Sequence, residues 1–328
     1  MRLLALDGGG SKTVCLLADE RGRVLGWGRG GPSNLSFVSA EAAGSAISTA
    51  IGAALTRAGL AGGCEPAIDV AACSGPVRPA FMAEAVCRAV RPAAYRFAGE
   101  AEACLAGAGA AFGAVVLAGT GCFEYARGRD GSEHRCDGWG SLFGDEGSAY
   151  DIARRALLAV ARMEDRRGPP TALREAVLKH FGAGTLRAAS RRIYGESLPR
   201  DEIARLAPLV ARLADEDEVA RGILEEAAQA LAHGVLTCIA ATGLSGARFT
   251  LALCGGVFRA GRGLIEPLVQ AVQTGAPGAE PLRPRFEPVY GALRIACRSA
   301  GLAWDEEVER AFVRSLGAGE LARLVSTD

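Results

Sequence analysis

Two glycine-rich turns, each directly after a short apolar run, constrain the fold of this chain more than any other feature. The first lies in Asp7–Thr13, with the sequence DGGGSKT, and the second is Gly119–Gly121. A glycine turn lets backbone N–H groups close on a phosphate with no Cβ in the way. The first turn is not a GxxxxGK[ST] loop, because Ser11 precedes Lys12, and Glu124 breaks a GxGxxG pattern in the second. The two turns therefore predict two hairpins that grip one nucleotide.

The segments around the turns follow one plan twice. Three short strands are expected in each half, Leu3–Asp7, Thr13–Asp19 and Arg23–Gly28, and then Ala114–Ala118, Cys122–Arg127 and His134–Gly140. A Gly-Trp-Gly triplet closes both sets. A helix is expected after each set, at Glu41–Ala58 and Ser148–Met163, and later a strand that ends in glycine, at Ile68–Gly75 and Phe249–Gly256. This order is unlike a Rossmann chain and predicts an α/β protein with two equivalent lobes, although turns can also recur by chance among 44 glycines.

The remaining segments suggest a domain organisation. We expect an N-terminal lobe at 1–113, a C-terminal lobe at 114–288 with a helical insertion at about 171–242, and a helical segment at 289–328 that packs back toward the first lobe. Apolar residues at helical spacing in the insertion are expected to be core. The proline-rich segment Gly275–Pro288 predicts an extended connection, and Tyr290–Ala300 a terminal helix.

Composition narrows the classes of partner. Lys plus Arg and Asp plus Glu each number 37, so nothing favours nucleic acid or an acidic membrane, and a small substrate is expected. No apolar run approaches the length of a signal peptide core or a membrane span, which favours a cytoplasmic protein. The ten cysteines form no CxxC pair and favour buried, reduced thiols over a metal or iron–sulfur site.

At this point the motifs resemble the sugar kinase/Hsp70/actin superfamily. Asp7–Thr13 resembles its first phosphate motif, Gly119–Gly121 its second and Leu253–Val257 its adenosine motif. Gly31–Asn34, and Gly138–Gly140 followed by Gly144–Tyr150, are similar to the N-acetylglucosamine kinases of the BadF/BadG/BcrA/BcrD ATPase family. The resemblance runs from residue 1 to about residue 300. It implies two ribonuclease H-like lobes of the actin-like ATPase fold, with an interlobe cleft and, as is usual in the family, a homodimer.

The resemblance also implies site residues, with ATP and Mg²⁺ as cofactors. The residues expected to bind ATP are Gly8, Gly9, Gly10, Ser11, Lys12, Thr13, Gly119, Thr120, Gly121, Gly255 and Gly256. The residues expected to bind the sugar are Asn34, Ser74, Gly138, Asp145, Glu146 and Ala149. Asp7 is expected to hold Mg²⁺ directly or through water, since Mg²⁺ prefers oxygen ligands. Asp7 and Asn34 could instead be turn residues, and Asp145 and Glu146 could be charges that favour a helix N-terminus.

The general base is where the sequence departs from the family pattern. The family carries a catalytic aspartate after the last strand of the first lobe, and here Glu100 stands at that position, after Ala94–Ala98. A carboxylate moved by one methylene can cost about a hundredfold in rate, so Glu102 or Asp145 remain alternatives, as does a site that binds without catalysis. In addition, Cys122 stands where the family usually has serine after Gly-Thr-Gly, and Asp137 stands where it usually has glycine before Gly-Trp-Gly.

The sequence thus predicts an ATP-dependent amino-sugar kinase, with N-acetylglucosamine 6-phosphate as the expected product. Two rivals stay open. One is an ATPase of the type that activates 2-hydroxyacyl-CoA dehydratases, and the other is a sugar- and nucleotide-binding sensor with weak or no kinase activity.

Overall fold

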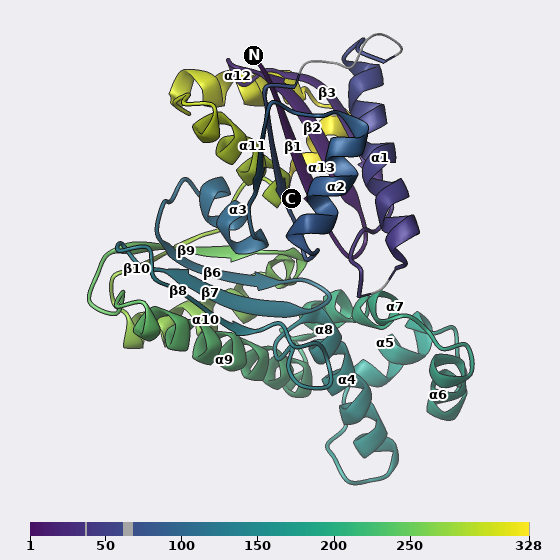
Figure 1. The fold of residues 1–328 in the computed structure, drawn as a ribbon. Helices are drawn as coiled ribbons and strands as arrows, with labels where there is room; N and C mark the ends of the chain where they lie inside the picture. Colours follow the sequence, from purple (N-terminus) through teal and green to yellow (C-terminus); the bar gives the residue numbers. More distant parts are fainter. Residues whose placement is uncertain (37, 62–67, 328) are drawn as a thin grey trace. The chain divides into compact units, whose positions relative to one another are not determined.

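The computed structural model describes residues 1–36, 38–61 and 68–327, and the chain divides into two compact units. Unit 1 comprises Met1–Ala111 and Pro284–Asp328, and unit 2 comprises Phe112–Arg283 (Figure 1). Each unit is built on one five-stranded mixed sheet with helices packed against it. The predicted α/β fold with two lobes of one plan is confirmed.

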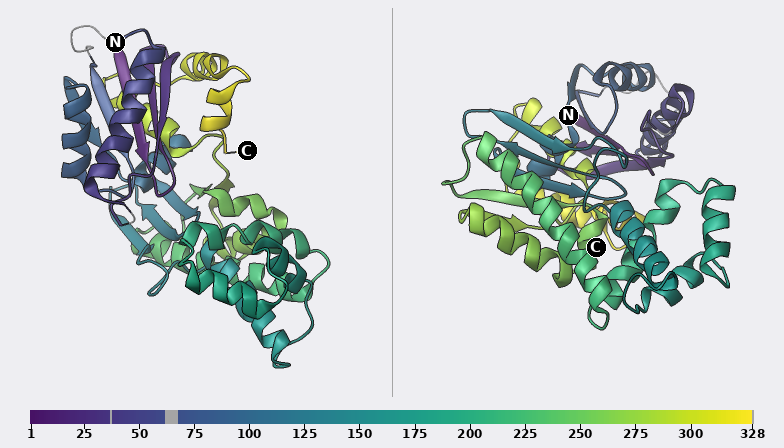
Figure 2. Two further views of the ribbon diagram at one scale, coloured as in Figure 1. Left: turned by 90° about the vertical axis from the view of Figure 1, so that its right-hand side faces the viewer. Right: turned by 90° about the horizontal axis from the view of Figure 1, so that it is seen from below.

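Unit 1 is a sheet between two helical layers. Its elements are β1 (Arg2–Gly8), β2 (Thr13–Asp19), β3 (Val24–Gly30), α1 (Ala40–Arg57), β4 (Val70–Ser74), α2 (Pro79–Ala89), β5 (Ala94–Phe97), α3 (Glu100–Gly107), α11 (Pro288–Ser299), α12 (Glu306–Leu316) and α13 (Glu320–Val325). The strand order is β3-β2-β1-β4-β5, in which β1, β4 and β5 run parallel. One face packs on α1 and α2 and the other on α11, α12 and α13, as the left view of Figure 2 shows.

Three alternate glycines in β3 explain how α1 lies on this sheet. A Cβ added to Gly26, Gly28 or Gly30 would come within 2.1, 1.9 and 2.0 Å of the carbonyl oxygens of Ala54, Ala50 and Ala46. The glycines repeat every two residues along the strand and the alanines every four along the helix, so one face of each element meets the other. The helix backbone therefore rests directly on the strand.

Unit 2 repeats the sheet of unit 1. Its elements are β6 (Gly113–Ala118), β7 (Cys122–Arg127), β8 (Glu133–Asp137), α4 (Ala149–Glu164), α5 (Leu173–His180), α6 (Leu186–Gly195), α7 (Arg200–Ala204), α8 (Ala207–Leu213), α9 (Glu218–Ala241), β9 (Phe249–Cys254), the 3₁₀ helix η1 (Gly256–Ala260), α10 (Arg262–Gly275) and β10 (Ala279–Leu282). The strand order is β10-β9-β6-β7-β8, which read from the other edge matches the order β3-β2-β1-β4-β5 of unit 1. Again an antiparallel meander is extended by two parallel strands.

The segment expected to be a helical insertion contains α5 to α9, and several of its apolar residues lie in the core of unit 2. Leu206, Val210, Leu224 and Leu231 are fully or almost fully buried in one cluster with strand residues such as Val116. Asp217 caps α9 by accepting a hydrogen bond from the Ala220 N–H at 2.9 Å. In the part of the chain that the structure describes, no helix is long and apolar enough to cross a membrane.

The structure corrects several expected boundaries. β8 ends at Asp137 rather than at Gly140, because Asp137 and Gly138 have φ of 59° and 76°, outside the extended region. The two Gly-Trp-Gly triplets are consequently not equivalent: Gly26–Gly28 lies within β3, whereas the second triplet lies in a loop with Trp139 exposed. The expected extended connection contains β10, and the terminal helix begins at Pro288, a residue suited to a first helical turn.

Candidate active site

Three candidate residues of unit 1 lie at or just beyond the carboxyl ends of neighbouring parallel strands. Asp7 is the penultimate residue of β1, Ser74 ends β4, and Glu100 begins α3 directly after β5. Asp7 pairs with Ser74 in the parallel register of β1 and β4. Because the carboxyl ends of parallel strands form one edge of a sheet, and ligands of open α/β sheets bind there, these side chains belong to one site region.

Asp7 is a half-buried carboxylate with few partners. The Ser74 hydroxyl donates to Asp7 Oδ1 at 2.7 Å. Burial raises the pKa of Asp7 to about 6, while the Ser74 hydrogen bond lowers it, Glu287 raises it and Lys12 lowers it to smaller extents. The charged form is therefore disfavoured in the protein alone, and a nearby cation would stabilise it. A single carboxylate with water ligands is a usual protein contribution to a Mg²⁺ site, so Asp7 fits that role.

The first glycine turn is held from behind by Thr13 and Ser33. Both side chains are fully buried. The Thr13 hydroxyl donates to the Gly31 carbonyl at 2.8 Å, and its oxygen lies 3.0 Å from Ser33 Oγ, within hydrogen-bond distance. The Gly9 carbonyl accepts from the Ser33 N–H at 3.0 Å. Thr13 thus fastens the turn, whereas Gly9, Ser11 and Lys12 remain at least partly exposed for a ligand. Lys12 Nζ lies 3.6 Å from Glu287 Oε1.

The structure places the remaining polar candidates of unit 1 in different settings. Asn34 Oδ1 accepts from the Ser36 N–H at 2.9 Å, the turn arrangement that the sequence left open. Glu102 accepts from Arg96 at 3.0 and 3.1 Å and from Arg298 at 3.2 Å. Glu100 is partly exposed at the start of α3, after Gly99. Glu102 is thus paired with two arginines, one from β5 and one from α11.

The second glycine turn, Gly119–Gly121, joins β6 to β7 and supports the start of α4. The Gly119 carbonyl accepts from the Ala149 N–H at 2.9 Å, and Thr120 accepts from the Tyr150 N–H at 3.3 Å. Where a side chain would stand at Gly119 the space is open. Gly255, after β9, has a φ of 101°, and its Cβ would come within 2.3 Å of the Ala118 carbonyl oxygen. Gly255 and Gly256 are exposed beside the turn, an open backbone surface that fits a nucleotide.

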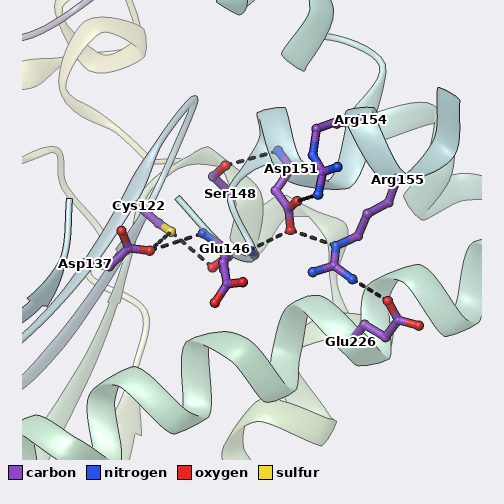
Figure 3. A network of polar contacts seen from close by, with 9 residues as sticks. Cys122, Asp137, Glu146, Ser148, Asp151, Arg154, Arg155 and Glu226 are labelled. Atoms are coloured by element: carbon purple, nitrogen blue, oxygen red, sulfur yellow. Dashed lines mark hydrogen bonds and ion pairs between the residues drawn. The ribbon is translucent and has the colours of Figure 1, made fainter. Parts of the chain in front are cut away.

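Asp137, the last residue of β8, accepts hydrogen bonds from the loop that follows the strand. It accepts from the Asp145 N–H at 2.9 Å through Oδ1. It also accepts from the Glu146 N–H at 3.1 Å through Oδ2 (Figure 3). The Cys122 thiol donates to the Glu146 carbonyl at 3.2 Å and contacts Asp137 Oδ2 at 3.6 Å. The two departures from the family pattern therefore act together, and both fix Asp145 and Glu146. Gly138 also lies in this loop, and Trp139, Leu142 and Phe143 are exposed there.

The first turn of α4 is fixed by a second network. Asp151 Oδ2 accepts from the Gly147 N–H at 3.1 Å, and the Asp151 N–H donates to the Ser148 hydroxyl oxygen at 3.2 Å. Arg154 and Arg155 donate to Asp151 at 2.9 and 2.8 Å, as Figure 3 shows. Burial alone would raise the pKa of Asp151, but these hydrogen bonds outweigh it and hold the pKa below its usual value.

Asp145 and Glu146 have opposite surroundings. Asp145 is 4% exposed with a φ of 61°, and its Oδ1 accepts from the Cys122 N–H at 3.1 Å. Its Oδ2 accepts from Arg200 Nη2 at 2.5 Å. The Glu146 side chain is exposed. Arg200 was missed from the sequence, because the helical insertion that carries it shows only apolar spacing and no motif.

The described residues contain no group of three or more His, Cys, Asp or Glu side chains arranged to hold a metal ion. All nine cysteines in the described part of the chain are free, and Cys64 lies outside it.

Comparisons with known proteins agree with this geometry. A stretch of the chain is 29% identical over 185 residues to an N-acetylmuramic acid/N-acetylglucosamine kinase of Clostridium acetobutylicum, covering 56% of this chain and 60% of that protein. Another is 31% identical over 194 residues to an N-acetyl-D-glucosamine kinase of Dictyostelium discoideum, covering 58% and 61%. The chain therefore spans about three fifths of the length of these curated relatives.

A solved structure extends the likeness over most of the fold. The crystal structure of a candidate N-acetylglucosamine kinase from Chromobacterium violaceum matches with a TM-score of 0.73 and 27% identity, over 90% of this chain and 98% of that one. The family model of the BadF/BadG/BcrA/BcrD ATPases matches residues 4–296. With its two repeated sheets and glycine turns, the chain belongs to the BadF/BadG/BcrA/BcrD ATPase family.

Proposed function

We propose that this chain transfers the γ-phosphoryl group of ATP to an amino sugar, with N-acetylglucosamine as the acceptor and its 6-hydroxyl as the nucleophile. The observation that carries the proposal is the edge of the unit 1 sheet, where Asp7, Ser74 and Glu100 lie at the carboxyl ends of three parallel strands beside a glycine turn. The names of the two curated relatives support an amino sugar as acceptor.

Glu100 is the proposed general base. Phosphoryl transfer needs little covalent help from the protein, but it requires a carboxylate that accepts the proton of the attacking hydroxyl. Glu100 begins α3, and the arginine contacts of Glu102 leave that neighbour unsuited to the role. Asp145 forms an ion pair with Arg200, and we assign its remaining acceptor capacity to binding of the sugar. The replacement of the family aspartate by glutamate is therefore compatible with catalysis.

Asp7 is the proposed Mg²⁺ ligand, either directly or through water. When bound, the metal screens the phosphates and stabilises the charge that develops on them. Asp7 must be ionised for this, and its pKa of about 6 means that ionisation becomes complete only above that pH. Gly8, Gly9, Gly10, Ser11 and Lys12 are the proposed phosphate donors on the same turn.

Unit 2 contributes the other proposed binding residues. Gly119, Thr120 and Gly121 offer backbone N–H groups to phosphate, and Gly255 and Gly256 leave room for adenosine. The proposed sugar contacts in unit 2 are Gly138, Asp145, Glu146 and Ala149, together with Asn34 and Ser74 of unit 1. We also propose that the protein is a homodimer, which light scattering would test.

The test is ADP release with Mg·ATP, measured with and without N-acetylglucosamine. We expect sugar-dependent release, and we expect Asp7→Asn to reduce it about a thousandfold, because a metal supplies several kcal/mol of transition-state stabilisation. The melting temperature should change little. Sugar-dependent release that survives in Asp7→Asn would remove Asp7 from the mechanism.

The absence of release from folded wild-type protein across a panel of amino sugars would contradict the kinase proposal. Sugar-dependent thermal stabilisation without ADP release would then favour the sensor, in which Glu100 has cost the site its chemistry.

A further inference from the structure

Arg200 reaches the candidate sugar site from the helical insertion. It is the first residue of α7, and its Nη2 donates to Asp145 Oδ2 at 2.5 Å. Its guanidinium carbon lies 4.9 Å from the centre of the Tyr150 ring, in the first turn of α4. These two contacts fix the plane and position of the guanidinium group beside Asp145.

One donor of this guanidinium group lacks a partner. Within the described residues, Arg200 Nε is a buried nitrogen that makes no hydrogen bond. Buried polar groups in folded proteins are nearly always hydrogen-bonded, so an exception calls for a water or a ligand. The exception here stands next to a carboxylate that sequence resemblance assigns to sugar binding.

Asp145 is held in place without being saturated. An ionised carboxylate has about four lone-pair directions. Only two hydrogen bonds to the Asp145 carboxylate are described, one from the Cys122 N–H and one from Arg200. Asp145 thus retains capacity to accept from a ligand, and its left-handed backbone conformation is of the strained kind that clusters at functional sites.

The two side chains together complement a hydroxylated ligand. A sugar hydroxyl both donates and accepts a hydrogen bond, and a neighbouring hydroxyl or amide oxygen offers a second acceptor. We propose that Arg200 is a sugar-binding residue, whose Nε–H donates to an oxygen of the bound amino sugar while Nη2 keeps Asp145 oriented toward the same molecule. This inference rests on the proposed function, because it assigns a further residue to the same sugar.

The test compares sugar affinity in Arg200→Lys and wild type by calorimetry without nucleotide, using N-acetylglucosamine and then the panel of glucosamine, N-acetylmannosamine and N-acetylmuramic acid. Lysine keeps a cation for Asp145 but has no counterpart of the Nε–H. We expect the dissociation constant for the sugar to rise by about ten- to a hundredfold, the range for a hydrogen bond from a charged donor. The affinity for ADP should be unchanged.

Two further variants make the test independent of folding defects. Arg200→Gln keeps a neutral donor and should give an intermediate loss, and the melting temperature of each variant without sugar shows whether the fold is intact. Arg205→Lys is the matched control, because Arg205 follows α7 directly, is exposed and contacts only the exposed carboxylates of Asp201 and Glu202 in its described ion pairs. It should bind sugar as the wild type does.

Sugar analogues identify the oxygen that Arg200 contacts. Removal of that oxygen should weaken binding to wild type but cause no additional loss in Arg200→Lys, since the pair would already be broken. Wild-type affinity in folded Arg200→Lys and Arg200→Gln would overturn the inference alone. A wild-type protein that binds none of the sugars would overturn the proposed function together with it.

Discussion

The sheets of the two units share one register but differ in the side chains at matched positions. Asp7 lies opposite Val14 and Ser74 in unit 1, as Leu117 lies opposite Phe123 and Cys254 in unit 2. The hydrogen-bonded pair of Asp7 and Ser74 thus corresponds to the apolar Leu117 and the weakly polar Cys254. Only unit 1 has a carboxylate at this position, which is why we assign metal binding to it.

The backbone at this edge is the same in both units. Gly75 follows β4 with a φ of 137°, and its Cβ would come within 2.2 Å of the Gly8 carbonyl oxygen. Gly255 follows β9 with a φ of 101°, and its Cβ would come within 2.3 Å of the Ala118 carbonyl oxygen. The two units thus share the glycines that shape the backbone at this edge, while the side chains that differ, such as Asp7 and Leu117, determine which unit can bind a metal.

The first residue of β2 and the first residue of its counterpart β7 both hold a loop in place through their side chains. Thr13 fastens the segment after β3, and Cys122 fastens the loop after β8. In unit 1 that segment leads to Asn34, and in unit 2 it carries Asp145 and Glu146. Both proposed sets of sugar contacts are thus anchored to a glycine turn.

After Asp7→Asn, the largest effect is expected at the two glutamates that follow β5 in unit 1, Glu100 and Glu102. Glu100→Gln should lower the rate of sugar-dependent ADP release by about a hundredfold or more, because a general base contributes on that scale. Glu102→Gln should keep the rate within a few-fold of wild type and lower the melting temperature slightly, since it loses contacts with Arg96 and Arg298. The reverse ranking would make Glu102 the base.

Gly75 and Gly255, which follow matched strands of the two units, should be equally intolerant of an added side chain. Gly75→Ala and Gly255→Ala should each lower the free energy of unfolding by about 2–4 kcal/mol, because both φ values are positive and the added Cβ meets a backbone oxygen. Urea unfolding measures this. Gly44→Ala in α1, where a Cβ would meet nothing within 4 Å, is the control and should be neutral or stabilising. A neutral Gly255→Ala would break the equivalence of the two units.

At one matched pair of buried residues, the residue in unit 2 carries a carboxyl group that makes the stability of the fold depend on pH. Glu124 in β7 corresponds to Cys15 in β2, and burial raises the pKa of Glu124 to about 8. The folded state therefore holds a proton that the unfolded chain releases near its ordinary pKa of 4.5. The stability from this difference is fully present below that pH and is lost as the pH rises through 8.

Glu124→Gln should remove this pH-dependent loss of stability. For a pKa shift of this size the loss in unfolding free energy is on the order of a few kcal/mol. The measurement is the free energy of unfolding of both proteins from pH 5 to 9. Glu133→Gln, an exposed residue of β8, should follow the wild-type curve. Parallel curves for Glu124→Gln and wild type would show that Glu124 is ionised in the folded protein.

The smallest effect is expected at Cys122. Cys122→Ser introduces a stronger donor toward the Glu146 carbonyl and Asp137. We expect a change in unfolding free energy below about 1 kcal/mol and little change in the sugar KM. A rise in KM of tenfold would show that the thiol sets the position of the sugar loop.

The sequence predicted the framework well, because that framework depends on local patterns. Thr13–Asp19 and Cys122–Arg127 are strands with the predicted bounds, since apolar runs and glycine turns define both ends. The end of β8 was wrong, because the positive φ of Asp137 depends on hydrogen bonds to residues of the following loop. Such bonds leave no periodic signal.

The site was predictable only where a motif carried it. Asp7 and Glu100 could be proposed because each lies at the end of a strand in a motif that resembles the family, whereas Arg200 lies 55 residues from Asp145 in a segment without a motif. The contact between Glu102 and Arg298 depends on packing between α3 and α11. Contacts between distant segments require the folded chain.

The most direct test of the division between the units is to measure sugar affinity and turnover in Asp7→Asn and Asp145→Asn, side by side with wild type. If unit 1 supplies the metal carboxylate and Asp145 binds the sugar, Asp7→Asn binds N-acetylglucosamine with wild-type affinity in calorimetry but releases almost no ADP. Asp145→Asn loses sugar affinity while it still binds ADP. Loss of sugar affinity in Asp7→Asn, or wild-type affinity in Asp145→Asn, would contradict the account.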